Sequence, residues 1–358
     1  MLRKVGLMKI KVITIHGIPN FGSVFQSYAL CKYLQENGYE DTELIDYNPE
    51  YFNKKNLRSL VGKLLNYRKY ITRKEKFKSF VEKNIPLTDE SFVSVDELKK
   101  AGLVADVFIA GGDQLWNVYH DSGRDEAYKL TFARGKKISY STSMGQKNFP
   151  KKELEELSNV IRAFSAISVR ESSSVELLKQ CNVEAIQCVD PVYLLNKEDY
   201  EKFLHPVNQP EYLLVYLVTP SKLLEDCIEY LSKKYNLKVI LCSGFSKKCT
   251  CDQFLKDLGP DEILSYIANA RFVLSSSFHA TSFSLIFEKQ FFTILPDEHT
   301  NERIVSLLEQ RCLSHRIITE KTDLEKALDN VIDYSVIDDY SECIEKSKDY
   351  LKKVLCDD

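Results

Sequence analysis

The sequence predicts an α/β protein built around two parallel β-sheets. Short runs rich in Ile, Val, Phe and Tyr alternate with longer segments of helical periodicity along most of the chain, which is the pattern of βαβ units. A length of 358 residues is sufficient for two domains of ordinary size. The pair Asp190-Pro191 interrupts the alternation, so we place a domain boundary close to it.

The first half contains the strands and helices of one sheet. Strands are expected where β-branched and aromatic residues are bounded by turn residues, at 9–16, 43–47, 106–110, 137–141 and 166–170. Crossover helices are expected at 23–36 and 152–164, where apolar residues recur at helical spacing. The basic, aromatic stretch 50–84 stands where a short connection is expected. We interpret it as a helical insertion into the first domain.

The second half repeats the alternation. Strands are expected at 212–218, 238–242, 271–275 and 291–295, and helices at 221–235, 261–270, 280–288 and 302–309. The predicted domains are therefore residues 1–186 and 187–322. Residues 323–358 form C-terminal helices, and the last of them is able to cross back to the first domain.

Composition excludes several classes of protein. The 49 basic and 52 acidic residues give a net charge of −3, which is too balanced for a nucleic-acid partner. The longest apolar run, 212–218, is far shorter than the roughly 20 residues that cross a bilayer. We expect a cytoplasmic protein without a transmembrane segment, and peripheral association with the inner face of the membrane is left open.

The ten cysteines indicate reduced thiols, because most of them lie within strand-like or helix-like segments. Cys249 and Cys251 form a single C-x-C without a second pair of ligands at zinc spacing. No metal and no cofactor are expected.

Polar residues follow the predicted strands of the first half, at the sheet edge where parallel sheets bind ligands. Asn20, Ser23 and Gln26 follow the first strand, but a P-loop lysine is missing there. Asp113, Gln114 and Asn117 follow the third strand without a dinucleotide fingerprint. Arg170, after the fifth strand, either forms an ion pair within the protein or binds a carboxylate or phosphate through two hydrogen bonds. These six loop residues and Arg170 are the first-domain candidates.

The last candidate loop ends a strand in three serines, Ser275, Ser276 and Ser277, and opens a helix around His279. A lone histidine is usually structural, but hydroxyls and free backbone N–H groups at a helix N-terminus suit a phosphate. An anion beside the imidazole favours its protonated form, which is that of a general acid. No signature of a serine hydrolase or a zinc protease is present.

Several motifs taken together resemble those of the polysaccharide pyruvyl transferase family. The resemblance depends on the order of these motifs and on their joint occurrence. The motifs are Asn20-Phe21-Gly22-Ser23 with Val24-Phe25-Gln26-Ser27-Tyr28-Ala29-Leu30, Gly112-Asp113-Gln114-Leu115-Trp116-Asn117, Ile138-Ser139-Tyr140-Ser141 with Met144-Gly145, Ser168-Val169-Arg170-Glu171, Asp190-Pro191, Gly259-Pro260-Asp261-Glu262 and Ser277-Phe278-His279-Ala280-Thr281. Two positions depart from the family pattern. Ala280 stands where glycine usually follows the histidine, and Gly112 stands where serine usually precedes Asp-Gln.

The resemblance implies two Rossmann-like domains with parallel sheets facing across a cleft, as in GT-B glycosyltransferases. It also implies transfer of the enolpyruvyl unit of phosphoenolpyruvate to two hydroxyls of a sugar, with a pyruvate ketal and phosphate as products. The acceptor would belong to a polysaccharide or to its lipid-linked or nucleotide-linked precursor. In the family, the positions of His279 and Arg170 lie at the donor site.

We therefore assign residues to roles in this reaction. His279 and Arg170 are predicted to be catalytic, and the predicted donor-binding residues are Ser275, Ser276, Ser277, Thr281, Ser282 and Arg303. The predicted acceptor-binding residues are Asn20, Ser23, Gln26, Asp113, Gln114 and Asn117. A solvated arginine at a helix start is an equally good interpretation of Arg303. Two other functions stay open: a GT-B-like glycosyltransferase that uses a sugar nucleotide, and a non-catalytic carbohydrate-binding protein.

Overall fold

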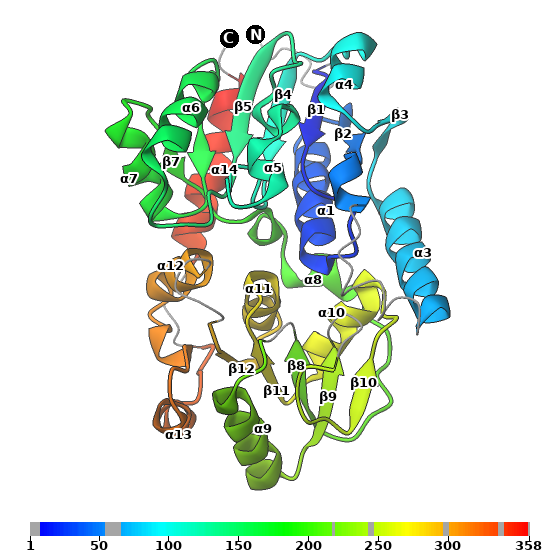
Figure 1. Ribbon diagram of the computed structural model, residues 1–358, viewed down its shortest axis with the longest axis vertical. Coiled ribbons are helices and arrows are strands. Elements are labelled where there is room, and N and C mark those ends of the chain that lie inside the picture. The colour runs from blue at the N-terminus through cyan, green and yellow to red at the C-terminus, as the bar shows by residue number, and fades with distance from the viewer. Residues whose placement is uncertain are drawn as a thin grey trace. The chain divides into compact units, whose positions relative to one another are not determined.

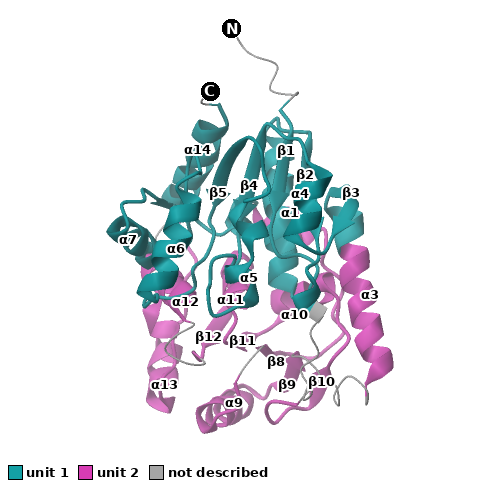
Figure 2. Ribbon diagram, turned by 45° about the horizontal axis from the view of Figure 1, so that its top comes forward, with its two compact units in different colours: residues 1–54, 81–195, 341–358 teal, residues 55–80, 196–340 magenta. Residues whose placement is uncertain are grey.

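The computed structural model describes residues 8–53, 66–216, 219–242, 247–295, 301–335 and 340–356. It divides into two compact units, each built on a five-stranded parallel sheet (Figure 1). The first unit comprises residues 1–54, 81–195 and 341–358, and the second comprises residues 55–80 and 196–340 (Figure 2). The predicted α/β class with two parallel sheets is confirmed.

The first sheet has the strand order β3-β2-β1-β4-β5, with all neighbours parallel. Its strands are β1 Ile10–Ile13, β2 Thr42–Tyr47, β3 Leu87–Phe92, β4 Val107–Gly111 and β5 Lys136–Tyr140. The chain leaves β1 toward β2 on one side and later returns to β4 on the other. The loops after β1 and β4 therefore flank the switch point of the sheet, which is where open α/β sheets bind ligands.

Helices and short strands complete the first unit. They are α1 Phe21–Glu36, η2 Glu50–Asn53, α4 Val95–Ala101, α5 Asp121–Arg124, η3 Glu126–Lys129, α6 Lys151–Ile161, β6 Ser168–Val169, α7 Ser172–Gln180, β7 Ile186–Gln187, η4 Pro191–Tyr193 and α14 Ser341–Cys356. The carboxamide of Asn20 caps α1 by accepting a hydrogen bond from the Gly22 amide at 3.1 Å. Most of α1 is buried, so its polar side chains face other protein groups.

The second sheet has the order β10-β9-β8-β11-β12 and is also parallel. Its strands are β8 Tyr212–Tyr216, β9 Lys238–Cys242, β10 Gln253–Leu255, β11 Phe272–Ser275 and β12 Gln290–Thr293. The helices of this unit are α8 Lys197–Glu201, α9 Lys222–Tyr235, α10 Pro260–Asn269, α11 Phe278–Ile286, α12 Glu302–Gln310, η5 Ser314–Arg316 and α13 Lys321–Asp329. Residues 217–218 of the predicted strand 212–218 lie outside the described residues.

Three strands were not predicted, and one prediction is corrected. The edge strand β3 reads Leu-Thr-Asp-Glu-Ser-Phe, too polar to stand out as a strand, and β7 and β10 contain only two and three residues. The predicted strand 166–170 shrinks to β6, which pairs with β7 in a separate two-stranded sheet. Isolated β-bridges between Ile138 and Ala166 and between Thr142 and Val169 place β6 beside β5.

The helical insertion belongs mainly to the second unit, which corrects its predicted place in the first domain. Helix α3 spans Tyr67–Asn84, and residues 55–80 group with the second unit. The Phe80 ring lies 5.1 Å from the Phe203 ring, and Lys76 forms an ion pair with Glu262 at 2.6 Å. Residues 54–65 of the predicted insertion lie outside the described residues.

The unit boundaries also differ from the predicted domains 1–186, 187–322 and 323–358. The first unit continues to Leu195, because η4 packs against α1. Helix α13 stays with the second unit, whereas α14 belongs to the first. The hydroxyl of Tyr350 on α14 donates to the Ser139 carbonyl at 2.9 Å, and the hydroxyl of Ser347 accepts from the Val189 amide at 2.9 Å.

Candidate functional site

The loops after β1 and β4 are joined by a buried carboxylate. Asp113 accepts a hydrogen bond from the Ser23 hydroxyl at 2.5 Å and from the Gln114 amide at 2.8 Å. Gly112 and Asp113 have φ angles of 59° and 55°, so two successive left-handed residues turn the chain sharply after β4. The turn directs Asp113 toward Ser23 in the first turn of α1.

Gln26 fills the space behind this turn. Its buried amide nitrogen donates to the Thr14 hydroxyl at 2.8 Å and to the Ser23 carbonyl at 2.9 Å. Its amide oxygen lies against Gly112, where an added Cβ would stand 1.9 Å from that oxygen. Glycine at 112 thus accommodates both the left-handed backbone and the close approach of the Gln26 side chain, which a serine in the same conformation would have to displace.

Gln114 and Asn117 form a second polar contact in the same loop. The Asn117 amide nitrogen donates to the Gln114 side-chain oxygen at 2.7 Å, and Gly145 packs against both. Asn117 is buried, whereas Gln114 is only partly buried. The structure thus brings the predicted acceptor residues to one sheet edge, with Asn20 and Gln114 partly exposed and Ser23, Gln26, Asp113 and Asn117 buried.

Arg170 lies at the end of β6 in an ion-paired network. Its guanidinium pairs with Asp190 and, through Nε at 3.4 Å, with Glu171. Burial opposes the charge of Arg170, but the two carboxylates outweigh it and raise the pKa of the guanidinium. Glu171 in turn accepts from the hydroxyls of Ser143 at 2.5 Å and Ser174 at 3.0 Å. Arg170 therefore has the carboxylate partners that the ion-pair interpretation requires.

A histidine–aspartate pair at the same sheet edge was missed by sequence reasoning. His16 follows β1 and Asp46 lies near the end of the neighbouring strand β2, and His16 Nε2 is 3.0 Å from Asp46 Oδ1. The other ring nitrogen is 3.1 Å from the Thr14 carbonyl. The usable signal was that His16 ends the first predicted strand, 9–16, and that Asp46 lies near the end of the second, 43–47. Consecutive strands are often adjacent in parallel sheets.

This pair fastens the loop after β1. Asn48 also donates to Asp46 Oδ1 at 2.5 Å. Partial burial would by itself raise the pKa of Asp46, but hydrogen bonds from His16, Ser91 and Asn48 and the proximity of His16 outweigh it and lower that pKa. His16 is 3% exposed, so it supports the loop and does not face solvent.

In the second unit, serine hydroxyls build the turn between β11 and α11. Ser275 donates to the Tyr216 carbonyl at 2.8 Å and accepts from the Ser277 amide at 2.9 Å. Ser277 is the N-cap of α11 and accepts from the Ala280 amide at 3.4 Å. Thr281 donates back to the Ser277 carbonyl at 3.1 Å. The hydroxyls fix the turn that presents the start of α11, and Ser276 and Ser277 are partly exposed within it.

His279 and Arg303 are both close to Phe278. His279 lies in the first turn of α11, is 4% exposed, and has its ring centroid 5.1 Å from that of Phe278. The guanidinium carbon of Arg303, in the first turn of α12, lies 5.9 Å from the Phe278 ring centroid. Ser282, one turn after His279, is fully buried. An imidazole, a guanidinium and a helix N-terminus in one unit suit an anionic ligand.

Arg170 belongs to the first unit and His279 to the second. Their joint action on one ligand therefore stays a prediction.

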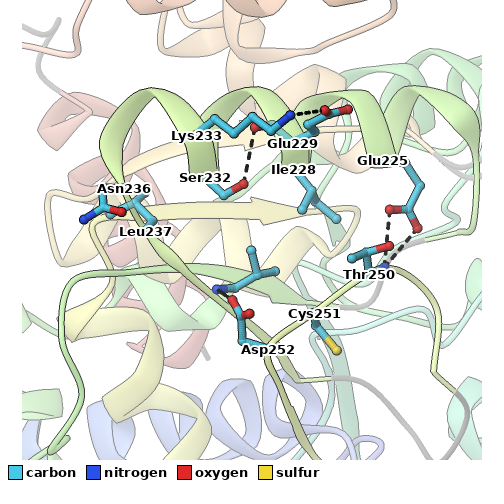
Figure 3. Close-up of a pocket in the computed structure, with 11 residues that line it drawn as sticks. Glu225, Ile228, Glu229, Ser232, Lys233, Asn236, Leu237, Thr250, Cys251 and Asp252 are labelled. Atoms are coloured by element: carbon cyan, nitrogen blue, oxygen red, sulfur yellow. Dashed lines mark hydrogen bonds and ion pairs between the residues drawn. The ribbon is translucent and has the colours of Figure 1, made fainter.

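A groove of about 500 Å³ in the second unit contains none of these residues (Figure 3). It lies along α9 and the segment that precedes β10, and its polar groups bind one another. The Glu225 carboxylate accepts from the Thr250 amide at 3.0 Å, Lys233 pairs with Glu229 at 2.5 Å, and Asp252 accepts from the Val239 amide at 2.7 Å. These hydrogen bonds serve the fold and point to no ligand.

The described residues contain no group of His, Cys, Asp and Glu side chains that could hold a metal ion. No helix within the described ranges combines the length and the hydropathy needed to cross a membrane.

Comparisons with known proteins agree with this fold and with the motifs. A family model for polysaccharide pyruvyl transferases matches residues 20–298. A UDP-N-acetylglucosamine 2-epimerase from Rickettsia bellii is similar in structure, with a TM-score of 0.59, 13% identity, and coverage of 97% of this chain and 96% of that one. The corresponding Methanocaldococcus jannaschii enzyme, in complex with UDP-GlcNAc and UDP, gives a TM-score of 0.57, 16% identity and coverage of 97% and 100%.

The UDP-GlcNAc 2-epimerase of Neisseria meningitidis, bound to UDP-GlcNAc, gives a TM-score of 0.56 at 11% identity, with coverage of 97% and 99%. At these identities the likeness concerns the fold alone, and it supports the predicted GT-B-like class. No curated protein sequence matches this chain.

Proposed function

Because this chain belongs to the polysaccharide pyruvyl transferase family, we propose that it transfers the enolpyruvyl unit of phosphoenolpyruvate to a sugar. Two hydroxyls of a polysaccharide or of its precursor would become bridged by a pyruvate ketal, and phosphate would be released. The proposed reaction needs no resident cofactor, since phosphoenolpyruvate is a co-substrate.

The observation that carries the proposal is the position of His279 at the start of α11, beside Phe278 and near Arg303. Backbone N–H groups at a helix start bind a phosphate well, and a nearby guanidinium adds charge-assisted hydrogen bonds. A bound phosphate favours the protonated imidazole of His279. The donor and its acid would then be held by the same helical turn.

The chemistry follows from this placement. The His279 imidazolium donates its proton to the methylene carbon of phosphoenolpyruvate, which becomes a methyl group and leaves an oxocarbenium-like centre at the adjacent carbon. The first sugar hydroxyl attacks that centre and returns a proton to the imidazole. The second hydroxyl then displaces phosphate, which takes up the remaining proton, and the ketal is complete. A positioned acid typically contributes about 10²–10⁴-fold in rate.

Arg170 is proposed to attract the donor carboxylate. Its ion pairs indicate a second, structural role. Its guanidinium already faces Asp190 and Glu171, so the same residue would also support the turn after β6. The two roles differ in kinetics. Direct donor binding predicts that Arg170→Ala raises the donor KM, whereas a purely structural role predicts lower stability with an unchanged donor KM.

On the acceptor side, exposure divides the proposed residues into two groups. Asn20 and Gln114 are partly exposed and are proposed to hydrogen-bond the sugar. Ser23, Gln26, Asp113 and Asn117 are buried and bonded within the protein. We propose that these four shape the acceptor loops from behind.

The test is to incubate the purified protein with phosphoenolpyruvate and a panel of lipid-linked and nucleotide-linked hexosides. Phosphate release that depends on an acceptor, together with the ketal mass on that acceptor, supports the proposal. His279→Gln should lower the rate about 10²–10⁴-fold. The matched control is His205→Gln, because His205 lies in the same unit but is exposed and pairs with Asp261.

An unchanged rate in His279→Gln would remove the acid role. Thermal stabilisation by a nucleoside diphosphate but not by phosphoenolpyruvate would instead favour a sugar-nucleotide glycosyltransferase. Acceptor binding without turnover of either donor would favour a non-catalytic carbohydrate-binding protein.

A further inference from the structure

Tyr119 lies on the loop between β4 and α5 and is unusually exposed for a large aromatic residue. Its side chain is 60% exposed, and only Tyr67, at 62%, is a comparably exposed aromatic among the described residues. The loop starts at the carboxyl end of β4, next to the switch point of the first sheet. Tyr119 is therefore an exposed aromatic ring at the sheet edge that carries the proposed acceptor residues.

The backbone under Tyr119 is held by several hydrogen bonds. The Tyr119 amide donates to Asn117 Oδ1 at 3.1 Å, and the His120 amide donates to the Asn117 carbonyl at 2.9 Å. On the far side of the loop, an added Cβ at Gly123 would stand 2.1 Å from the Asn117 carbonyl oxygen. The turn has no room to shift toward α5.

The start of the loop is anchored as well. Trp116, which is fully buried, donates from its indole to the Tyr128 carbonyl at 3.2 Å and from its backbone amide to the Ser143 carbonyl at 3.2 Å. The Ser122 hydroxyl donates to the Gln114 carbonyl at 3.1 Å. An aromatic ring on such a fixed backbone loses little conformational freedom on binding, which improves affinity.

The chemistry around Tyr119 is that of a neutral polar ligand with an apolar face. Gln114 provides a partly exposed amide in the same loop, and the exposed charges of Asp121 and Arg124 have opposite signs. These two charges cancel, so they do not favour an anionic ligand at this position. A sugar ring has an apolar C–H face for an aromatic surface and hydroxyls for amide and carboxylate groups.

We propose that Tyr119 is the platform on which a sugar ring of the acceptor stacks, with the amide of Gln114 as a neighbouring hydrogen-bonding group. The inference rests on the proposed function and specifies its acceptor side. It assigns a specificity role to a residue that takes no part in the proposed proton transfer.

The experiment measures acceptor binding without phosphoenolpyruvate, so that it does not depend on turnover. A panel of hexose glycosides is titrated against the wild-type chain, Tyr119→Ala, Tyr119→Phe and the matched control Tyr67→Ala, with binding followed by saturation-transfer NMR and calorimetry. Tyr119→Ala should weaken binding of the preferred glycoside about 10-fold, as for the loss of a central aromatic contact. Tyr119→Phe and Tyr67→Ala should bind as the wild type does. Trp116 fluorescence verifies that the Tyr119 variants are folded, and far-UV circular dichroism verifies the same for Tyr67→Ala, because Tyr67 lies in the second unit.

The proposal is overturned if Tyr119→Ala binds the glycoside as tightly as the wild type, if Tyr119→Phe loses as much affinity as Tyr119→Ala, or if the wild type binds no glycoside of the panel. A different result separates this proposal from the proposed function. If the wild type binds a glycoside through Tyr119 but releases no phosphate from phosphoenolpyruvate, the sugar platform stands and the pyruvyl transfer does not.

Discussion

Replacing Gly112 with alanine tests whether the contact with Gln26 determines the residue at this turn. Gly112 has a φ of 59°, and an added Cβ would lie 1.9 Å from the side-chain oxygen of Gln26 and 3.1 Å from Pro191 Cγ. Gly102 has the same φ of 59° but no atom within 4 Å of an added Cβ. Gly102→Ala therefore measures the backbone effect alone, and the difference between the two variants measures the packing effect.

The two effects have different sizes. A left-handed conformation costs a non-glycine residue about 1–2 kcal/mol, which is the expected loss for Gly102→Ala. Overpacking of a filled interior adds about 1–3 kcal/mol, because Gln26 is held by its hydrogen bonds to Thr14 and Ser23. Gly112→Ala should therefore lower the free energy of unfolding by about 2–5 kcal/mol.

Urea unfolding followed by tryptophan fluorescence is the appropriate assay. Trp116 is the only tryptophan of the chain and is buried in the first unit, which also contains both glycines, so its signal reports on the relevant transition. The double variant Gly112→Ala with Gln26→Ala should be less destabilised than the sum of the two single variants. Equal losses for Gly112→Ala and Gly102→Ala would show that the contact with Gln26 has no energetic consequence.

Three further predictions concern buried charges and thiols. Asp190→Asn removes a buried carboxylate that pairs with Arg170, so the first unit should lose about 3 kcal/mol of stability in the same unfolding assay, and an unchanged midpoint would contradict the ion-pair network. The lowered pKa of Asp46 means that its contribution is present above the unfolded value of about 3.9 and is lost as the pH falls through the folded value. Between pH 5 and pH 3 the wild type should therefore lose more stability than Asp46→Asn, and equal losses would refute this. Burial raises the pKa of Cys31 and Cys242 to about 12, so a thiol reagent should label the exposed Cys312 and Cys356 in the native protein, and rapid native labelling of Cys31 or Cys242 would contradict the described packing.

The sequence was most informative where local periodicity decides the structure. The sheet strands β1, β2, β4, β5, β8, β9, β11 and β12 overlap their predicted ranges, and so do the helices α1, α6, α9, α10, α11 and α12. Alternating apolar runs and helical spacing act over a few neighbouring residues, so they can be recognised in the sequence. The start of α11 could also be predicted from local sequence. Ser277 caps a helix whose first turn contains His279, and both the capping hydroxyl and the histidine can be read directly from the sequence.

Only the tertiary structure decided which residues depend on one another across long stretches of chain. Arg170 pairs with Asp190, His16 pairs with Asp46, and Gly112 is constrained by Gln26, although each partner lies in a separate segment. The membership of α3 in the second unit likewise depends on contacts such as Phe80 with Phe203. Such pairings follow from which strands and helices become neighbours in space, and local sequence patterns do not encode that choice.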